Sequence, residues 1–141
     1  MKIIRCKEDI YSTLAEIWKR SVMATHDFLS IDDFHEIKDA LIPEYFPNVD
    51  LYAIIDNDSV TGFIGIVSDS IEMLFIDGSC RGKGYGTALL DFALRSGASK
   101  VDVNEQNVSA LGFYKAKGFR VIGRNETDEA GRPYPILHLS L

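Results

Sequence analysis

The stretch Arg81-Gly82-Lys83-Gly84-Tyr85-Gly86-Thr87 decides the fold of this 141-residue chain. Three glycines within five positions let a backbone turn tightly and approach a ligand without Cβ clashes. An apolar segment, 72–76, precedes the stretch, and leucines at helical spacing follow it, so we predict a strand, a loop and a helix. The first N–H groups of a helix lack internal partners and favour a phosphate group. With the charges of Arg81 and Lys83 beside them, we predict a pyrophosphate site.

Other phosphate-binding loops fit the spacing less well. A Walker A loop needs Lys after its last glycine, but Gly86 is followed by Thr87. In the Rossmann fingerprint the third glycine comes one residue later, and that loop usually follows the first strand rather than the fourth. Asp102 lies about 20 residues on, where an acidic ribose ligand would stand, so a nucleotide-binding oxidoreductase remains an alternative. A glycine-rich turn without a ligand is another, which the adjacent basic residues oppose.

Hydrophobic patterning places the other elements on both sides of this loop. The order β-α-α-β-β-β-α-β-α-β-β predicts an α/β (α+β) fold in one domain over 1–141, with a mixed sheet of about seven strands and helices on both faces. The predicted strands are 2–6, 51–55, 60–67, 72–76, 100–103, 119–123 and 136–141.

Helix ends are predicted from capping residues. Asp9 is expected to cap the first helix. The second follows Ser30, carries Phe34, Ile37, Leu41 and Ile42 on its apolar side, and is expected to stop near Pro43. Gly97 suits the end of the helix after the glycine-rich loop, and Gly118 that of the next. Asn107 or Ser109 can cap this next helix at its start.

Composition excludes several classes of protein. Fifteen Lys and Arg against 21 Asp and Glu give a net charge of −6, which disfavours general nucleic-acid binding because phosphate contacts need concentrated positive charge. No apolar run approaches the ~20 residues of a membrane span. Two cysteines, Cys6 and Cys80, without a secretory leader predict free thiols and a cytoplasmic protein.

Two motifs together resemble the GNAT N-acetyltransferase superfamily. Arg81-x-x-Gly84-x-Gly86 matches its acetyl-CoA loop pattern, R/Q-x-x-G-x-G/A, and the segment 107–119 matches its later motif, N-x-x-A-x-x-F-Y-x-x-x-G-F. Within the superfamily, the segments 24–29, 103–107 and 131–135 look like the bacterial YjaB-type subgroup. One departure is Gly78, where many members carry Pro, so we expect a looser start of the loop.

The resemblance implies a function and a cosubstrate. It implies that acetyl-CoA, without a metal, donates an acetyl group to a primary amine of a small molecule or peptide, by direct attack in a ternary complex. The backbone near Leu74, Phe75 and Ile76 would hold the pantetheine arm like an added strand. The implied pyrophosphate residues are Arg81, Gly82, Lys83, Gly84, Tyr85, Gly86 and Thr87. Asn107 would bind the cofactor or simply cap its helix.

The resemblance also implies catalytic roles. Tyr114 stands where the motif carries its thiolate-protonating tyrosine, and a phenol with a pKa near ~10 is protonated at pH 7. Glu72 on the fourth strand and His26 in the acceptor loop are candidate bases. An ordinary packing role for Tyr114, exposed structural roles for the two bases, and deprotonation through water remain alternatives.

Two other functions remain open at this level. One is a non-catalytic acyl-CoA-binding or regulatory module, and the other, less favoured, is the NAD-binding oxidoreductase that would use Asp102. The acceptor amine is not identified by the residues. A homodimer is possible, and neither a nucleic acid nor a membrane is an expected partner.

Overall fold

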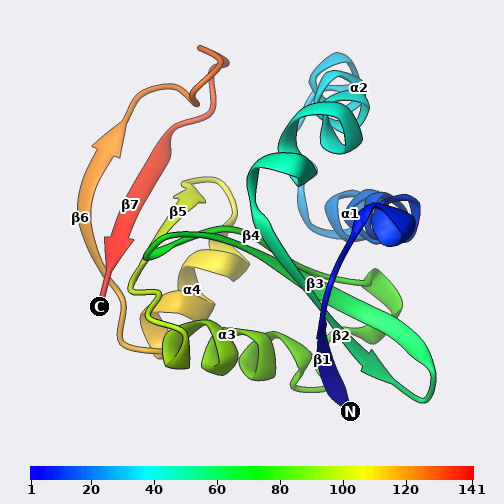
Figure 1. Cartoon of the computed structure of the whole chain (residues 1–141). Coiled ribbons are helices and arrows are strands. Elements are labelled where there is room, and N and C mark those ends of the chain that lie inside the picture. Colours follow the sequence, from blue (N-terminus) through cyan, green and yellow to red (C-terminus); the bar gives the residue numbers. More distant parts are fainter. The chain divides into compact units, whose positions relative to one another are not determined.

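The computed structural model describes residues 1–141, which form two compact units, Met1–Ala98 and Ser99–Leu141. Seven strands and four α-helices follow one another in the predicted order (Figure 1). The single domain over 1–141 stays a prediction. The first unit contains β1 (Lys2–Arg5), α1 (Tyr11–Thr25), α2 (Ile31–Ala40), β2 (Asp50–Asp56), β3 (Ser59–Val67), β4 (Ser70–Ile76) and α3 (Tyr85–Arg95). The second contains β5 (Lys100–Asn104), α4 (Val108–Ala116), β6 (Arg120–Asn125) and β7 (Ile136–Ser140).

The strands of the first unit pair antiparallel in the order β1-β2-β3-β4. β2 and β3 lie over the predicted strands 51–55 and 60–67 and form a hairpin, whose turn residues Asn57 and Asp58 have φ angles of 50° and 63°. Asn and Asp tolerate this left-handed region, which two-residue hairpin turns require. The turn therefore fixes the register between β2 and β3, and β4 pairs with the other edge of β3.

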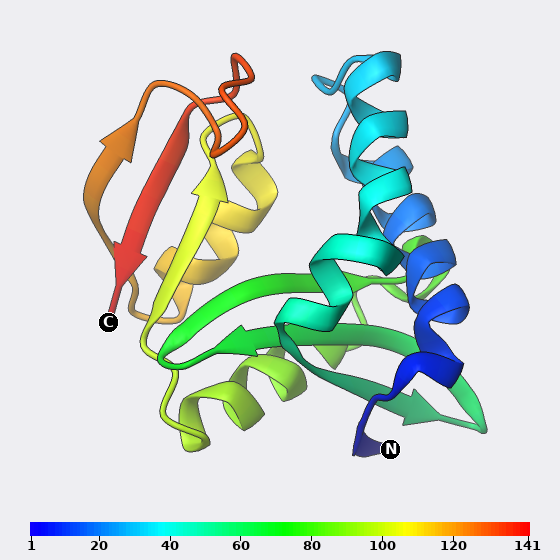
Figure 2. The same cartoon turned by 45° about the horizontal axis from the view of Figure 1, so that its top comes forward.

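Helices cover both faces of this four-stranded sheet, with α1 and α2 on one side and α3 on the other (Figure 2). The core under α1 joins its apolar stripe to the sheet through Leu14, Ile17, Trp18, Val22, Phe46 and Phe63, all buried. The Trp18 ring stacks on Phe34 of α2 with 5.3 Å between centroids. Burial of each such side chain stabilises the fold by about 1.5–3 kcal/mol, so this core holds α1 firmly against β3 and β4.

Three predictions for the first two helices differ in detail from the structure. Asp9 caps nothing, because it lies inside a 3-10 turn, Glu8–Ile10, and α1 begins without a side-chain cap. The chain also continues helically past Pro43, through a π-helical turn at Leu41–Tyr45 and a 3-10 turn at Phe46–Asn48. Proline has no backbone N–H, and the irregular hydrogen bonding of a π-helical turn accommodates this missing donor. The irregular turn leaves Leu41 buried but Ile42 43% exposed, so Ile42 is not a core residue.

The second unit is a three-stranded antiparallel sheet, in the order β5-β7-β6, with α4. Asn107 caps α4 by accepting a hydrogen bond from the Ala110 amide at 3.2 Å, which decides between the two predicted caps. Gly118, at a φ of 98°, ends the helix as predicted. Phe119 then packs its ring on Tyr114, so the end of α4 is locked to the start of β6.

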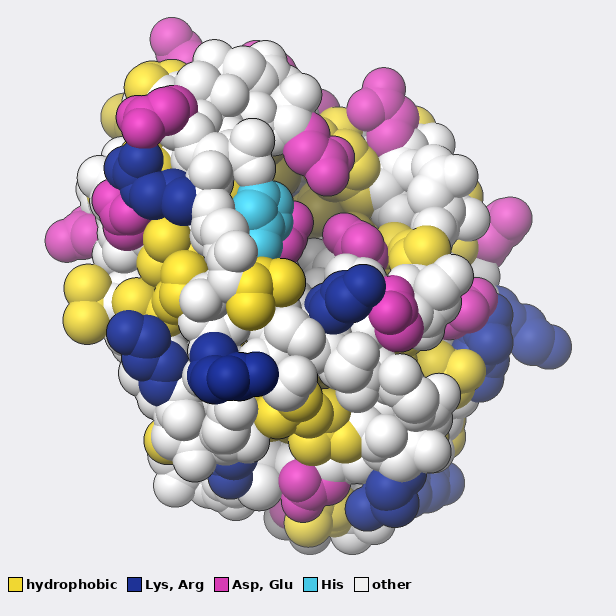
Figure 3. All heavy atoms as spheres, turned by 90° about the vertical axis from the view of Figure 1, so that its left-hand side faces the viewer, with side chains coloured by type: hydrophobic (Ala, Val, Ile, Leu, Met, Phe, Trp, Pro, Cys, Tyr) yellow, Lys and Arg dark blue, Asp and Glu magenta, His cyan; other side chains and the backbone are white.

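Charges of both signs are distributed over the surface. Figure 3 shows a face on which acidic and basic side chains alternate with apolar ones.

None of the helices is long and apolar enough to cross a membrane. No group of three or more His, Cys, Asp and Glu side chains is arranged to hold a metal ion.

Candidate functional site

The fourth strand contains a β-bulge at Glu72. Its neighbours Ile71 and Met73 pair with Ile66 and Gly65 of β3, which are consecutive, so the register between the two strands shifts by one residue at Glu72. A bulge resets the alternation of side chains and bends the strand. It also leaves Glu72 exposed.

Beyond the bulge, the last residues of β4 alternate regularly. Phe75 packs into the core under α1 and lies 5.7 Å from the Phe63 ring. Leu74 and Ile76 point to the opposite face, since they pair with Ile64 and Gly62 of β3. The side chain of Phe75 thus serves the core, and only its backbone remains a candidate for the cofactor.

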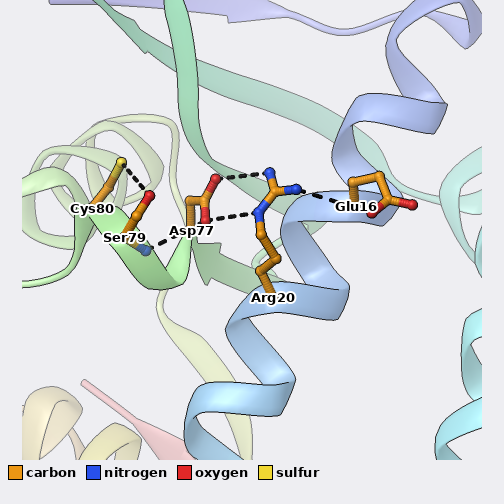
Figure 4. A network of polar contacts seen from close by, with 5 residues as sticks. All are labelled: Glu16, Arg20, Asp77, Ser79 and Cys80. Atoms are coloured by element: carbon orange, nitrogen blue, oxygen red, sulfur yellow. Dashed lines mark hydrogen bonds and ion pairs between the residues drawn. The ribbon is translucent and has the colours of Figure 1, made fainter.

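The start of the glycine-rich loop is tied to α1 by a bidentate ion pair. Arg20 donates from Nε and Nη2 to the two carboxylate oxygens of Asp77, at 3.0 and 2.8 Å. The same carboxylate caps the 3-10 turn Gly78–Cys80 through the Ser79 amide, and Glu16 lies 4.0 Å from Arg20 (Figure 4). Hydrogen bonds to charged groups are about twice as strong as neutral ones. The Arg20 guanidinium also holds the pKa of Asp77 below its ordinary value of 3.8.

Gly78 allows α1 to lie close to this turn. A Cβ at Gly78 would stand 3.2 Å from the backbone oxygen of Arg20, which is tighter than a normal contact. Glycine therefore replaces the Pro of the family pattern because the helix backbone occupies that space. Together with the Arg20–Asp77 pair, this contact ties the start of the loop to α1. The looser start of the loop stays a prediction.

The loop itself has the geometry of an anion site. Gly82 and Gly84 have φ angles of 79° and 85°, in the left-handed region that favours glycine. Gly84 is the N-cap of α3 and supplies no side-chain cap. The first amides of α3, at positions 85–87, therefore receive no intrahelical acceptor, and they lie at the positive end of the helix dipole.

Both side chains that add positive charge to this loop, Arg81 and Lys83, are exposed. The amides and the two cations match the predicted pyrophosphate residues, but no ligand tests them, and their roles stay predictions. Gly86 and Thr87 lie in the first turn of α3, as expected.

Tyr85 anchors the beginning of α3. Its ring is buried, and its hydroxyl donates to Asp56 at the end of β2, over 2.7 Å. This bond raises the pKa of Tyr85 and lowers the pKa of Asp56. The side chain of Tyr85 is thus a structural anchor, and only its backbone amide remains a candidate for binding the pyrophosphate.

His26 lies at the C-terminal end of α1, where its amide donates to the Val22 oxygen. Its ring lies 5.2 Å from Phe28 and 6.5 Å from Phe75 of β4. Burial between these rings lowers the pKa of His26, although the charge of Asp27 acts in the opposite direction. A lowered pKa keeps the imidazole neutral near pH 7, as a general base requires.

In the second unit, Tyr114 lies on α4 with 5% of its surface exposed, between the rings of Phe113 and Phe119. Burial raises the pKa of Tyr114 well above its ordinary value of 10.0, so the phenol stays protonated at all physiological pH values. Its hydroxyl oxygen is either hydrogen-bonded or in contact with solvent. The side chain therefore combines an apolar packing role with an oxygen that can act as a donor.

Asp102 is engaged in a structural contact. His138 of β7 lies between Asp102 of β5, at 2.7 Å from Nδ1, and Asn125 of β6, which contacts Nε2. This cross-strand pairing gives Asp102 a role that needs no ribose. The nucleotide-binding alternative is therefore not favoured.

Four functional or supporting residues were missed by the sequence analysis. Arg20, Asp56 and Asp77 belong to the networks above, and the hydroxyl oxygen of Thr25 lies 2.6 Å from Nδ1 of His26. Asp77 stands 57 positions from Arg20, and Asp56 stands 29 from Tyr85. No periodic signal connects such pairs. Thr25 could have been noticed, because a hydroxyl beside a candidate base at a helix end can bond to it.

Comparisons with known proteins agree with this geometry. Residues 22–135 match the family model described as an acetyltransferase (GNAT) domain. The chain is 41% identical, over 99% of its length and 97% of the relative's, to the peptidyl-lysine N-acetyltransferase YjaB of Salmonella typhimurium.

Solved structures show the same fold. The solution structure of apo-form YjaB from Escherichia coli matches with a TM-score of 0.91 at 40% identity, covering 99% of this chain and 95% of the other. A putative acetyltransferase from Salmonella typhimurium, yncA, solved with its cofactor acetyl-CoA, matches with a TM-score of 0.65 at 18% identity, covering 100% and 92%. The predicted α/β fold class is confirmed by these matches.

Proposed function

Because the chain belongs to the GNAT acetyltransferase family and is an acetyl-CoA-dependent N-acetyltransferase, we propose that its acceptor is the lysine side chain of a peptide or protein. The observation that carries this proposal is the 41% identity, over nearly the whole chain, to a peptidyl-lysine N-acetyltransferase. A lysine amine is also an acceptor of the predicted class, a primary amine.

Acetyl-CoA is proposed to bind at the start of α3. The amides at 85–87 lack intrahelical acceptors, and Gly84 at a φ of 85° lets the backbone approach the pyrophosphate. Arg81 and Lys83 add charge. The backbone of 74–76 on β4 is proposed to bind the pantetheine amides in the manner of an added strand.

The proposed reaction takes two protons from the amine and gives one to the thiolate. A protonated lysine amine has a pKa of ~10.4 and must lose one proton to the base before it attacks the thioester carbon and forms a C–N bond. The nitrogen of the tetrahedral intermediate then loses a second proton, the C–S bond breaks, and Tyr114 gives its proton to the departing thiolate. The second proton from the nitrogen restores the phenol, and the first stays on the base. Burial disfavours the phenolate of Tyr114, so the phenol is protonated and holds the proton that the thiolate needs.

His26 is proposed as the base, in preference to Glu72. It is half-buried beside β4 and has a lowered pKa, so it is neutral at the pH of the reaction. Glu72 is exposed, and a carboxylate is a weaker base for an amine than an imidazole. Removal of His26 should therefore flatten the acidic limb of the kcat/KM profile, whereas Glu72→Gln should leave it.

The acceptor is tested with matched peptides. The purified protein is incubated with acetyl-CoA and an N-terminally blocked peptide containing one lysine, and thiol release and the site of acetylation are measured. The same peptide with arginine in place of lysine is the control. Turnover of small polyamines or free peptide N-termini, without turnover of the blocked lysine peptide, would contradict the lysine assignment and leave the acetyltransferase class intact.

We also propose three expectations about domain organisation, cellular compartment and oligomeric state. The family model covers residues of both compact units, which supports a single functional domain. Cys6 and Cys80 are free thiols, which supports a reducing compartment such as the cytoplasm. A homodimer is to be tested by light scattering of the purified protein with and without acetyl-CoA.

A further inference from the structure

The hydroxyl of Thr25, the last residue of α1, lies between two possible hydrogen-bond partners. Its hydroxyl oxygen is 2.8 Å from the backbone oxygen of Ser21 and 2.6 Å from Nδ1 of His26. Ser21 is buried, and Thr25 and His26 are half-buried. The hydroxyl carries one proton, so it can donate to only one of the two.

The hydrogen-bond chemistry of these three groups decides where the protons lie. A backbone oxygen only accepts, so its contact with Thr25 is a hydrogen bond only if the hydroxyl donates to it. The hydroxyl must then accept from the other side, which requires a proton on Nδ1 of His26. In the opposite tautomer the hydroxyl would donate to Nδ1, and two oxygen atoms would face each other at 2.8 Å without a proton between them. The Nδ1–H form therefore makes two bonds where the alternative makes one.

We propose that Thr25 is a positioning residue that holds neutral His26 in the Nδ1–H tautomer and so makes Nε2 the basic nitrogen. The inference rests on the proposed role of His26 as the base that receives the lysine proton. In that role, Nε2 accepts the proton and the ring becomes a cation, while the Nδ1–H···Oγ1 bond to Thr25 persists and strengthens.

The surroundings of His26 agree with this arrangement. The rings of Phe28 and Phe75 restrict the imidazole plane, and burial between them keeps it neutral. Asp27, adjacent in the chain, is the charged group that acts on His26 in the opposite direction. The Cβ of Thr25 carries a hydroxyl oxygen and a methyl carbon, which together restrict its χ1 rotamer, and the hydroxyl lies toward Ser21 and His26.

The tautomer is measured directly by ¹⁵N NMR of the histidine ring in the substrate-free protein. The wild type is expected to show a protonated Nδ1 and an unprotonated Nε2 for His26, assigned through a spectrum of His26→Gln. Thr25→Val keeps the shape but removes the acceptor, so its His26 should shift toward the Nε2–H form. Thr25→Ser keeps the hydroxyl and should retain the wild-type pattern. A wild-type ring protonated on Nε2 would overturn the proposal, whether or not the protein acetylates lysine.

A kinetic arm shows whether the tautomer matters for the reaction. Thr25→Val should lower kcat/KM for the lysine peptide about tenfold or more, part of the 10²–10⁴ that a positioned base contributes, and should change the acidic limb of its pH profile. KM for acetyl-CoA should stay near the wild-type value, and Thr25→Ser should restore most of the activity. A Thr25→Val protein with a shifted tautomer but a superimposable pH profile would overturn the positioning role. Absence of lysine turnover in the wild type would instead count against the proposed acceptor.

Discussion

The role of the Tyr114 hydroxyl can be tested by a single substitution. Its ring is packed between Phe113 and Phe119, and its hydroxyl is the part that the proposed chemistry uses. Tyr114→Phe removes that oxygen and keeps the ring. We expect kcat to fall by about 10²–10⁴, the usual contribution of a positioned proton donor, with little change in KM for acetyl-CoA. Single-turnover rates measure this best, because product release can limit kcat.

The matched control for this substitution is Tyr11→Phe. Tyr11 also packs on a phenylalanine, Phe46, but it lies at the start of α1 in the core of the first unit. Tyr11→Phe should leave the single-turnover rate unchanged. A folded Tyr114→Phe protein with wild-type rates would return Tyr114 to the role of a packing residue in α4.

Asp77 gives the stability of the fold a defined acid dependence. Because Arg20 lowers its pKa in the folded state below 3.8, the ionised pair stabilises the fold above the unfolded pKa, and this contribution is lost as the pH falls through the folded value. Asp77→Asn keeps a cap for the Ser79 amide but removes the charge. It should lower the free energy of unfolding at pH 7 by about 1.5–3 kcal/mol, as for a hydrogen bond to a charged group.

Denaturant titrations of wild type and Asp77→Asn at several pH values test this dependence. The difference between the two proteins should be constant from neutral pH to about pH 5 and should shrink below about pH 4. The pKa values of Asp56 and Glu105 are also lowered in the folded state, but both proteins contain these residues, so their effects cancel. A difference that stays constant down to pH 2 would show that the ion pair does not stabilise the fold.

At the scale of elements, α3 offers a comparison between its two ends. Gly84 at its start and Gly97 at its end both have left-handed φ angles, 85° and 102°, and a Cβ at either would meet no atom within 4 Å. Gly84→Ala and Gly97→Ala should therefore each cost about 1–2 kcal/mol of stability from backbone strain alone. Only Gly84→Ala should weaken coenzyme A binding, by about tenfold or more in a calorimetric Kd. Equal affinities in the two variants would show that the backbone at Gly84 does not approach the ligand.

Elements set by local chemistry could be predicted from the sequence. The hairpin turn at Asn57, the Asn107 cap and the glycine-ended helix at Gly97 each depend on a few neighbouring residues. The glycine-rich loop was located for the same reason.

Features set by pairing across the fold could not be predicted. The bulge at Glu72 exists only in the register of β4 against β3. The Arg20–Asp77 pair requires α1 to lie on the sheet before the two side chains can meet. The Asp9 cap failed because a 3-10 turn took up the residues before α1. Local signals thus predicted the motifs, and tertiary packing decided which side chains hold them in place.

For the whole molecule, ligand binding should be visible as added stability. A ligand at a hundred times its Kd stabilises a protein by about 2.7 kcal/mol, which corresponds to roughly 8 °C in Tm for a chain of this size. Acetyl-CoA should produce such a shift, and NAD at the same concentration should not, because Asp102 is paired with His138. An equal shift with NAD, measured by calorimetry, would contradict the assignment of the loop to coenzyme A.

The stack of Trp18 on Phe34 makes the protein its own fluorescent reporter. Trp18 is the chain's one tryptophan, and it is buried in the first compact unit. Its emission therefore follows the loosening of α1 from α2, whereas far-ultraviolet circular dichroism averages over both units. Coincident denaturation curves from the two signals would mean that residues 1–141 melt as one cooperative body. An earlier loss of emission would instead reveal that the helices around His26 open before the rest of the chain.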